Sequence, residues 1–316
     1  MEITKEVEKK LKLLNEKYAA NGQDVLAYLD GLLYQDYVKY WDYIELDTLL
    51  SLQKPRTNFA DEEIFIIYHQ ITELYFKLCL NELKLISNKE IISAEFFLER
   101  LSRVTRYFGA LIDSFEIMSK GMDNKEFMKF RMALLPASGF QSAQYRLIEF
   151  HCTDLKNLVH VDQREALAKE TNLERLYENV YWKEGAKDLA TNKKTLTLIQ
   201  FEEQYEETFL KYTKHRASDN LWQSYLKLSD TDQKNPEIIE ELKKLDQAVN
   251  VNWPLSHYKS AVRYLQTKEG DVNATGGTNW QKYLPPRFQK RVFFPSIWSP
   301  EEMEVWGKAW VEDALL

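Results

Sequence analysis

Histidine is the residue type best suited to chemistry in this chain, and the histidine spacing excludes several kinds of site. The five histidines are His69, His151, His160, His215 and His257. No two of them have the H-E-x-x-H spacing of a zinc enzyme, and the chain has no P-loop, Rossmann glycine pattern or G-x-S-x-G motif. The sequence therefore gives no support to a hydrolase or a nucleotide-binding enzyme.

Two of these histidines occupy apolar faces of predicted helices. His69 follows Phe65 by four residues, so both side chains point the same way on a helix. His257 shares a helix face with Ala261 and Tyr264. Each could be a core histidine hydrogen-bonded to a neighbour, which spacing alone favours, or an imidazole offered to a metal in an apolar pocket, as haem requires.

Arg131 is a candidate for binding an anion. It follows Phe127 by four residues and lies between Phe130 and Met132, so it is partly buried if this helix packs. A buried arginine needs an anion. That anion could be a carboxylate of the protein or a carboxylate on a ligand, and the residues alone leave both open.

The composition favours a helical enzyme-sized domain and excludes some partners. Only 10 glycines and 8 prolines occur in 316 residues, which predicts long helices. The aromatic content of 13% is typical of a large aromatic core and also fits an aromatic ligand pocket. The formal charge of −7, without a basic run, argues against a nucleic-acid partner.

Two cysteines, Cys79 and Cys152, are too few for a disulfide framework and form no C-x-x-C motif. The charged N-terminus lacks the apolar core of a signal peptide, and no apolar stretch approaches the roughly 20 residues that cross a bilayer. We therefore expect a cytoplasmic protein in a reducing compartment, without a membrane partner.

Hydrophobic periodicity predicts an all-α protein. The clearest predicted helices cover residues 3–20, 61–86, 93–121, 123–135 and 253–265. Residues 61–86 are apolar on nearly every face, which predicts a helix in the middle of a bundle. We expect an N-terminal helical segment over 1–45, used in oligomer contacts, and a single large bundle-type domain over 46–316.

Four runs of residues, in matching order, resemble the tryptophan 2,3-dioxygenase family. They are Y-W-D-Y-I (40–44), D-E-E-I-F-I-I-Y-H-Q-I-T-E-L-Y-F-K (61–77), F-R (130–131) with P-A-S-G-F-Q-S-A-Q-Y-R (136–146), and W…H (253–257) with A-T-G-G (274–277). The resemblance covers about residues 40–298. The two central runs are long and unusual in composition.

This resemblance implies a haem-dependent dioxygenase. Members of the family use O2 to cleave the C2–C3 bond of the indole of L-tryptophan, which gives N-formylkynurenine and begins the kynurenine pathway of tryptophan catabolism. It further implies one haem b, and hence one iron, per subunit, a haem pocket enclosed by the helical domain, and a homotetramer.

The resemblance also assigns roles to residues of this chain. His257 would be the axial ligand of the haem iron, and His69 would be the catalytic histidine that hydrogen-bonds the indole N–H. Arg131 would pair with the substrate carboxylate. Further substrate-binding residues would be Phe65 and Phe127 around the indole, Thr275 at the amino-acid end, Ser138 and Gly139 beside haem and ligand, and Tyr40, Tyr43 and Ile44 from a neighbouring subunit.

Three departures from the family pattern leave alternatives open. Ala60 replaces a histidine, Tyr75 replaces a tryptophan, and the G-T-G-G-S-S-G run is A-T-G-G-T-N-W over 274–280. Because that last run recognises the amino-acid end of the substrate, a haem-dependent monooxygenase or hydroxylase of another indole or phenol amino acid is an alternative. A non-enzymatic haem-binding helical protein is a second one.

Overall fold

The computed structural model describes residues 3–188, 191–267, 270–271, 281 and 284–306. The chain forms two compact units, Met1–Gln53 and Lys54–Leu316. The prediction of an all-α protein is confirmed, since the strands among the described residues are the short antiparallel pair β1 (Gln266–Thr267) and β2 (Gly270–Asp271). No described helix is both long and apolar enough to cross a membrane.

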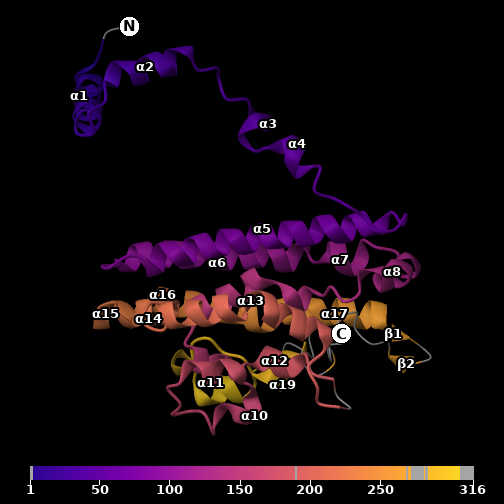
Figure 1. Cartoon of the computed structure of the whole chain (residues 1–316). Coiled ribbons are helices and arrows are strands. Elements are labelled where there is room, and N and C mark those ends of the chain that lie inside the picture. The colour runs from indigo at the N-terminus through magenta and orange to yellow at the C-terminus, as the bar shows by residue number, and fades with distance from the viewer. Residues whose placement is uncertain (1–2, 189–190, 268–269, 272–280, 282–283, 307–316) are drawn as a thin grey trace. The chain divides into compact units, whose positions relative to one another are not determined.

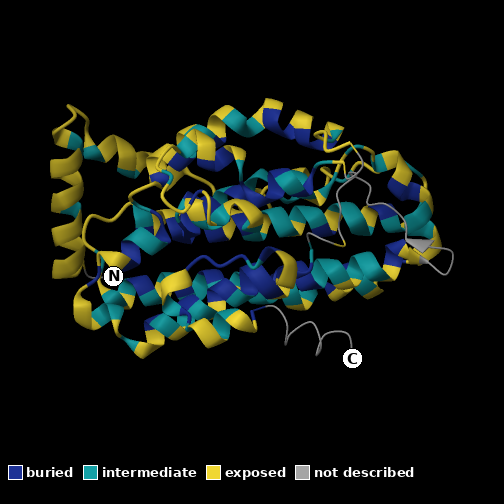
Figure 2. Ribbon diagram, turned by 90° about the horizontal axis from the view of Figure 1, so that it is seen from below, coloured by how far each residue is buried: buried dark blue, intermediate teal, exposed yellow. Residues whose placement is uncertain are grey.

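The first unit consists of two longer helices and two short ones, and none of them has a buried residue. Its elements are α1 (Lys5–Ala19), α2 (Val25–Tyr34), α3 (Tyr40–Tyr43) and α4 (Leu46–Leu49). Side chains of Thr4 and Asp24 cap α1 and α2 by accepting hydrogen bonds from backbone N–H groups. Neither α1 nor α2 has a buried residue (Figure 2), although α2 is mostly apolar. This unit therefore exposes apolar side chains such as Leu32 and Leu33.

The second unit is the helical body of the protein (Figure 1). Its longer helices are α5 (Asp61–Ser87), α6 (Ala94–Ser114), α9 (Ala143–Cys152), α13 (Leu196–Arg216), α16 (Pro236–Gln247) and α17 (Trp253–Leu265). Its short helices are α7 (Glu116–Lys120), α8 (Asn124–Phe130), α10 (Val161–Arg164), α11 (Leu173–Glu178), α12 (Tyr181–Gly185), α14 (Leu221–Leu226), α15 (Asp230–Gln233), α19 (Pro286–Gln289) and α20 (Pro300–Glu304). Single turns are η1 (Arg131–Leu134), η2 (Gly139–Gln141), η3 (Leu155–Leu158), η4 (Ala248–Asn252) and η5 (Pro295–Ile297).

Helices α5 and α6 lie side by side and form the first tier of this body (Figure 1). The inner face of α6 is a stripe of fully buried residues at helical spacing: Phe97, Leu101, Val104, Phe108 and Leu111. In Figure 1, α13, α14, α16 and α17 make a second tier, and α10, α11, α12 and α19 make a third. Helix α16 packs on α6, and α9 packs on both α5 and α13.

The expectation that α5 is buried on every face is wrong. Helices α6 and α9 cover one side of it, whereas Ile67, Ile71, Leu74 and Leu78 on another side are 37–51% exposed within the chain. Apolar residues on nearly every face of α5 therefore do not place this helix in the middle of the bundle. One of its apolar sides is left partly exposed. These four residues form an apolar stripe along the helix.

Helices α16 and α17 form one continuous run joined by the single π-helical turn η4. Asn235 caps the start of α16, and Pro236 occupies the first turn, where its missing N–H costs nothing. The predicted helix from Trp253 to about Leu265 is confirmed as α17. The π turn adds one residue to the helical path just before α17. Single π turns of this kind often accompany functional sites.

Candidate haem and substrate site

His257, in the first half of α17, is anchored to the backbone of its own helix. Its Nδ1 lies 3.0 Å from the carbonyl oxygen of Trp253. Because a carbonyl oxygen only accepts, Nδ1 carries the proton and Nε2 keeps a free lone pair. Burial lowers the pKa of His257 to about 4, so the imidazole is neutral at neutral pH. A neutral imidazole with one nitrogen hydrogen-bonded and the other open is the donor that a haem iron needs.

Aromatic rings hold the imidazole of His257 in place. The ring of Trp253 lies 4.4 Å away edge-on, and the ring of Phe115 lies 4.5 Å away. Trp253 is recognisable in the sequence because it precedes His257 by one helical turn. Phe115 comes from the end of α6, and no local pattern in the sequence points to its role here.

His69 on α5 repeats the arrangement of His257. Its Nδ1 lies 2.7 Å from the carbonyl oxygen of Phe65, which leaves Nε2 as the hydrogen-bond acceptor. Burial lowers the pKa of His69, and His69 in turn contributes to the lowered pKa of His257. The two histidines, which are far apart in the sequence, therefore lie in one region of the fold.

An aromatic wall joins α5, α8 and α17. The ring of Phe127 lies 6.3 Å from that of Phe65 and 4.6 Å from that of Tyr264. Phe130 contacts both phenylalanines edge-on, at 5.9 Å and 5.5 Å. The hydroxyl of Tyr264 donates to the carbonyl oxygen of Met118 at 2.9 Å, which ties α17 to α7. The predicted indole-lining residues Phe65 and Phe127 are thus brought together with His69.

Arg131 follows α8 directly and opens the turn η1. Its side chain is 3% exposed, and burial lowers its pKa. Arginine stays protonated in proteins, so this is a buried positive charge one turn from Phe127. Asp123 fixes the start of α8 by accepting from the N–H groups of Lys125 and Glu126 at 2.8 and 3.0 Å. A buried guanidinium beside an aromatic wall can bind a planar carboxylate through two hydrogen bonds.

Ser138 and Gly139 stand at the entry of η2, where Ser138 shapes the local turn. Its Oγ accepts from the N–H of Phe140 at 3.4 Å, and its own N–H donates to Oε1 of Gln141 at 3.2 Å. The amide of Gln141 donates onward to the carbonyl oxygen of Thr197 on α13. These contacts give Ser138 a structural role, and its predicted role beside haem and ligand stays a prediction.

The remaining predicted site residues are Thr275, Tyr40, Tyr43 and Ile44. Thr275 falls outside the described residues. Tyr40, Tyr43 and Ile44 belong to the first unit, in and just after α3, and the two tyrosines are 70% and 79% exposed. Their roles stay predictions.

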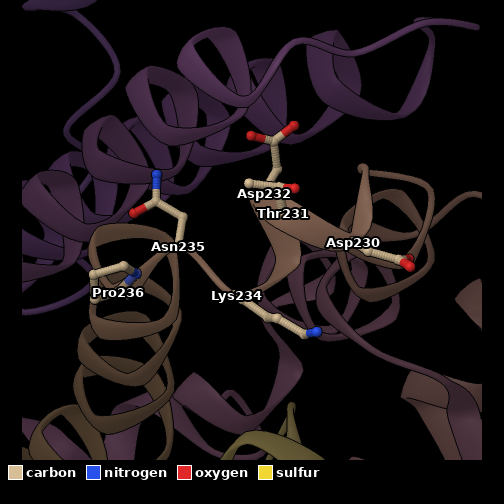
Figure 3. A pocket seen from close by; sticks show the side chains of 6 residues that line it. All are labelled: Asp230, Thr231, Asp232, Lys234, Asn235 and Pro236. Atoms are coloured by element: carbon tan, nitrogen blue, oxygen red, sulfur yellow. The ribbon is translucent and has the colours of Figure 1, made fainter.

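Two surface cavities contain none of the predicted site residues. One, of about 490 Å³, lies at the connection from α15 to α16 and is lined by Asp230, Thr231, Asp232, Lys234, Asn235 and Pro236 (Figure 3). The other, of about 320 Å³, lies between α9, α11 and α13. The side chains that line the first cavity are all polar apart from Pro236 and include no imidazole, so this cavity does not resemble a haem pocket.

Comparisons with known proteins show the family of this chain. The profile of the family described as tryptophan 2,3-dioxygenase matches residues 31–251. The tryptophan 2,3-dioxygenase of Ruegeria sp. (strain TM1040) is 30% identical over 295 residues, which cover 88% of this chain and 95% of that protein. The tryptophan 2,3-dioxygenase of Geobacillus thermodenitrificans is 29% identical and covers 84% of this chain and 92% of its own length. The chain therefore belongs to the tryptophan 2,3-dioxygenase family and is an oxidoreductase of the dioxygenase class.

Proposed function

We propose that this enzyme binds haem b through His257 and uses O2 to cleave the indole C2–C3 bond of L-tryptophan, giving N-formylkynurenine. The observation that carries the proposal is the pair of neutral, backbone-anchored histidines, His69 and His257, next to an aromatic wall and the buried Arg131. We further propose that the enzyme acts in tryptophan catabolism by the kynurenine pathway, in the cytoplasm, where free buried cysteines such as Cys79 stay reduced.

The residues present fit a haem. His257 is a neutral imidazole in an apolar setting, its proton is held on Nδ1 by Trp253, and Nε2 is left to bind iron. Bound there, the haem iron would bind and activate O2, while the side chains position the substrate. His257 would therefore hold the haem iron through Nε2.

Arg131 and the aromatic wall account for substrate orientation. The guanidinium would bind the substrate carboxylate, and the rings of Phe65 and Phe127 would hold the indole. Phe127 and Arg131 come from α8 and the turn that follows it, and Phe65 comes from the adjacent α5. The amino-acid end and the ring end of the substrate would therefore be fixed together. Holding reactants in one orientation can remove several kcal/mol of a barrier.

His69 would orient the indole through its open nitrogen. Because its Nδ1 bonds to the Phe65 carbonyl, Nε2 can accept a hydrogen bond from the indole N–H. Burial lowers the pKa of His69, so the imidazole is a weak base. We therefore assign it an orienting role instead of proton abstraction.

The proposal includes a homotetramer in which the N-terminal segment contacts a neighbouring subunit, with Tyr40, Tyr43 and Ile44 closing the pocket. The support is the unburied apolar surface of α1 and α2. Deleting residues 1–45 should abolish activity and change the sedimentation coefficient. A fully active monomer would contradict this part of the proposal.

The test of the reaction is a product assay with the reduced, haem-loaded enzyme, L-tryptophan and ¹⁸O2. The dioxygenase predicts N-formylkynurenine that carries two labelled oxygen atoms. The departure from the family pattern over 274–280 favours one rival, a monooxygenase of another indole or phenol amino acid, which would add a single labelled atom. Absence of any N-formylkynurenine from an enzyme that binds haem and O2 would defeat the dioxygenase proposal.

A further inference from the structure

Asp246, in the last turn of α16, is a fully buried carboxylate outside the site described above. Its Oδ1 accepts from the side-chain amide of Asn250 at 2.7 Å and from the N–H of Phe293 at 2.9 Å. Its Oδ2 accepts from the N–H of Phe294 at 3.2 Å and from the indole Nε1 of Trp298 at 3.0 Å. One side chain thus joins α16, the π turn η4 and the segment around η5.

All four of these donors are uncharged. Burying an ionised carboxylate is unfavourable, and burial raises the pKa of Asp246 to about 6 despite the four hydrogen bonds. An apolar side chain would fill the same space without that penalty. The carboxylate therefore acts through what its hydrogen bonds hold in place.

The hydrogen bonds of Asp246 hold the π turn η4 in place. Asn250, which is 1% exposed, lies inside η4, and its amide donates to Asp246 one turn earlier. In addition, the hydroxyl of Tyr145 on α9 donates to the carbonyl oxygen of Val249 at 3.3 Å. A π turn contains one residue more than an α-helical turn, and these two hydrogen bonds hold Asn250 and Val249 of η4 in place.

The extra residue sets the rotation of α17. Each residue of an α-helix turns the side-chain direction by about 100°. If η4 relaxed to an α-helical turn, the side chains of α17 would be rotated by about that angle against α6 and α7. His257 would then lose its contact with Phe115.

We propose that Asp246 is a positioning residue for His257: by holding Asn250 and the 293–298 segment, it keeps the π turn that aims Nε2 of His257 at the haem iron. This inference rests on the proposed function, in which His257 is the iron ligand.

The test uses the full-length, haem-loaded protein and Asp246→Asn, which preserves shape but replaces one acceptor oxygen by a donor. We expect an altered axial-ligand signature in electron paramagnetic resonance and haem transfer to apomyoglobin that is about tenfold faster or more. Backbone amides of residues 248–262 should also exchange faster with deuterium. Trp298→Phe removes one of the four donors and should act in the same direction with a smaller effect.

Asp154→Asn is the matched control. Asp154 accepts from the amides of Asn220 and Gln223, on the side of the second unit formed by η3 and α14. This variant should keep the wild-type spectrum and transfer rate. Equal acceleration in Asp154→Asn and Asp246→Asn would show general destabilisation and overturn the inference.

A wild-type spectrum, transfer rate and exchange pattern in Asp246→Asn would also overturn it. If Asp246→Asn does not fold, Trp298→Phe decides by the same three measurements. If the wild-type protein binds no haem, the proposed function fails, whereas deuterium exchange over 248–262 still shows whether Asp246 holds the π turn.

Discussion

Two buried polar regions of this protein differ in how their polar side chains are paired. Around Glu149 on α9, Arg146 and Arg291 each donate to the carboxylate, at 2.9 and 2.8 Å, and the hydroxyl of Tyr181 donates to it at 2.5 Å. All four residues are at least 94% buried. In this network the opposite charges of the protein pair with one another.

In the site, His69 and His257 are bonded on one side only. Each gives its Nδ1 proton to a carbonyl oxygen of its own helix, and each keeps Nε2 as an acceptor. Burial alone therefore does not identify a functional group. A buried group becomes reactive when local contacts satisfy part of its bonding capacity and leave the rest directed at a ligand.

The largest expected effect comes from removing the proposed iron ligand. His257→Ala should lose most of the bound haem, because the alanine side chain has no nitrogen to coordinate the iron. Haem is measured by the Soret band and by extraction. His151→Phe is the matched control, since His151 on α9 is also buried, with a pKa lowered by burial to about 3, and should keep its haem. Wild-type haem content in His257→Ala would exclude it as the ligand.

Breaking the closed network should affect stability and leave the site intact. Glu149→Gln strands two buried guanidinium groups, and breaking a buried ion pair typically costs about 3–5 kcal/mol of unfolding free energy. Urea unfolding measures this loss. Glu207→Gln, which disrupts an exposed pair with Lys211, should leave stability nearly unchanged. Loss of haem affinity in folded Glu149→Gln would show that the two regions are coupled.

Arg131→Ala should leave haem content unchanged and damage substrate use. The substrate carboxylate would lose a desolvated partner, which typically costs about 3–5 kcal/mol, so kcat/KM for L-tryptophan should fall at least about a hundredfold. Arg131→Lys keeps the charge without the planar fork and should lie between the two. Steady-state assays decide, and an unchanged kcat/KM in Arg131→Ala would show that Arg131 does not bind the substrate carboxylate.

Acid should destabilise the haem-free protein partly through His257. Burial lowers its pKa from 6.5 to about 4, so between these values the unfolded chain binds a proton that the folded chain does not. The contribution of His257 to the unfolding free energy is complete above about pH 6.5 and is lost as the pH falls through about 4. The loss amounts to up to about 3 kcal/mol. The contribution of His257 is the difference between the unfolding free energies of wild type and His257→Phe, measured with urea across this pH range. The opposite contribution of Asp246 is common to both proteins and cancels. Parallel curves would contradict the assignment.

The smallest expected effect belongs to His69. His69→Ala removes one orienting hydrogen bond, worth roughly 0.5–1.5 kcal/mol, so turnover should slow by about two- to tenfold while haem remains bound. His160→Ala, which removes the side chain that caps α10, should keep wild-type turnover. Complete loss of haem in His69→Ala would mean that the two histidines have exchanged roles.

Much of the site follows from local spacing in the sequence. The pairs Phe65 and His69, and Trp253 and His257, are each separated by one helical turn, and helix geometry places their side chains together wherever the helix lies. The two backbone hydrogen bonds that set the histidine tautomers also span one turn. The all-α class followed likewise from hydrophobic periodicity and the scarcity of glycine and proline.

Tertiary structure alone decided how these local pairs meet. The convergence of α5, α8 and α17, the contact of Phe115 with His257, and the four hydrogen bonds of Asp246 all join residues that are distant in the sequence. The exposed stripe of α5 was likewise decided by which helices pack on it. Periodicity specifies which face of a helix is apolar, but the partner for that face is selected by packing over the whole chain.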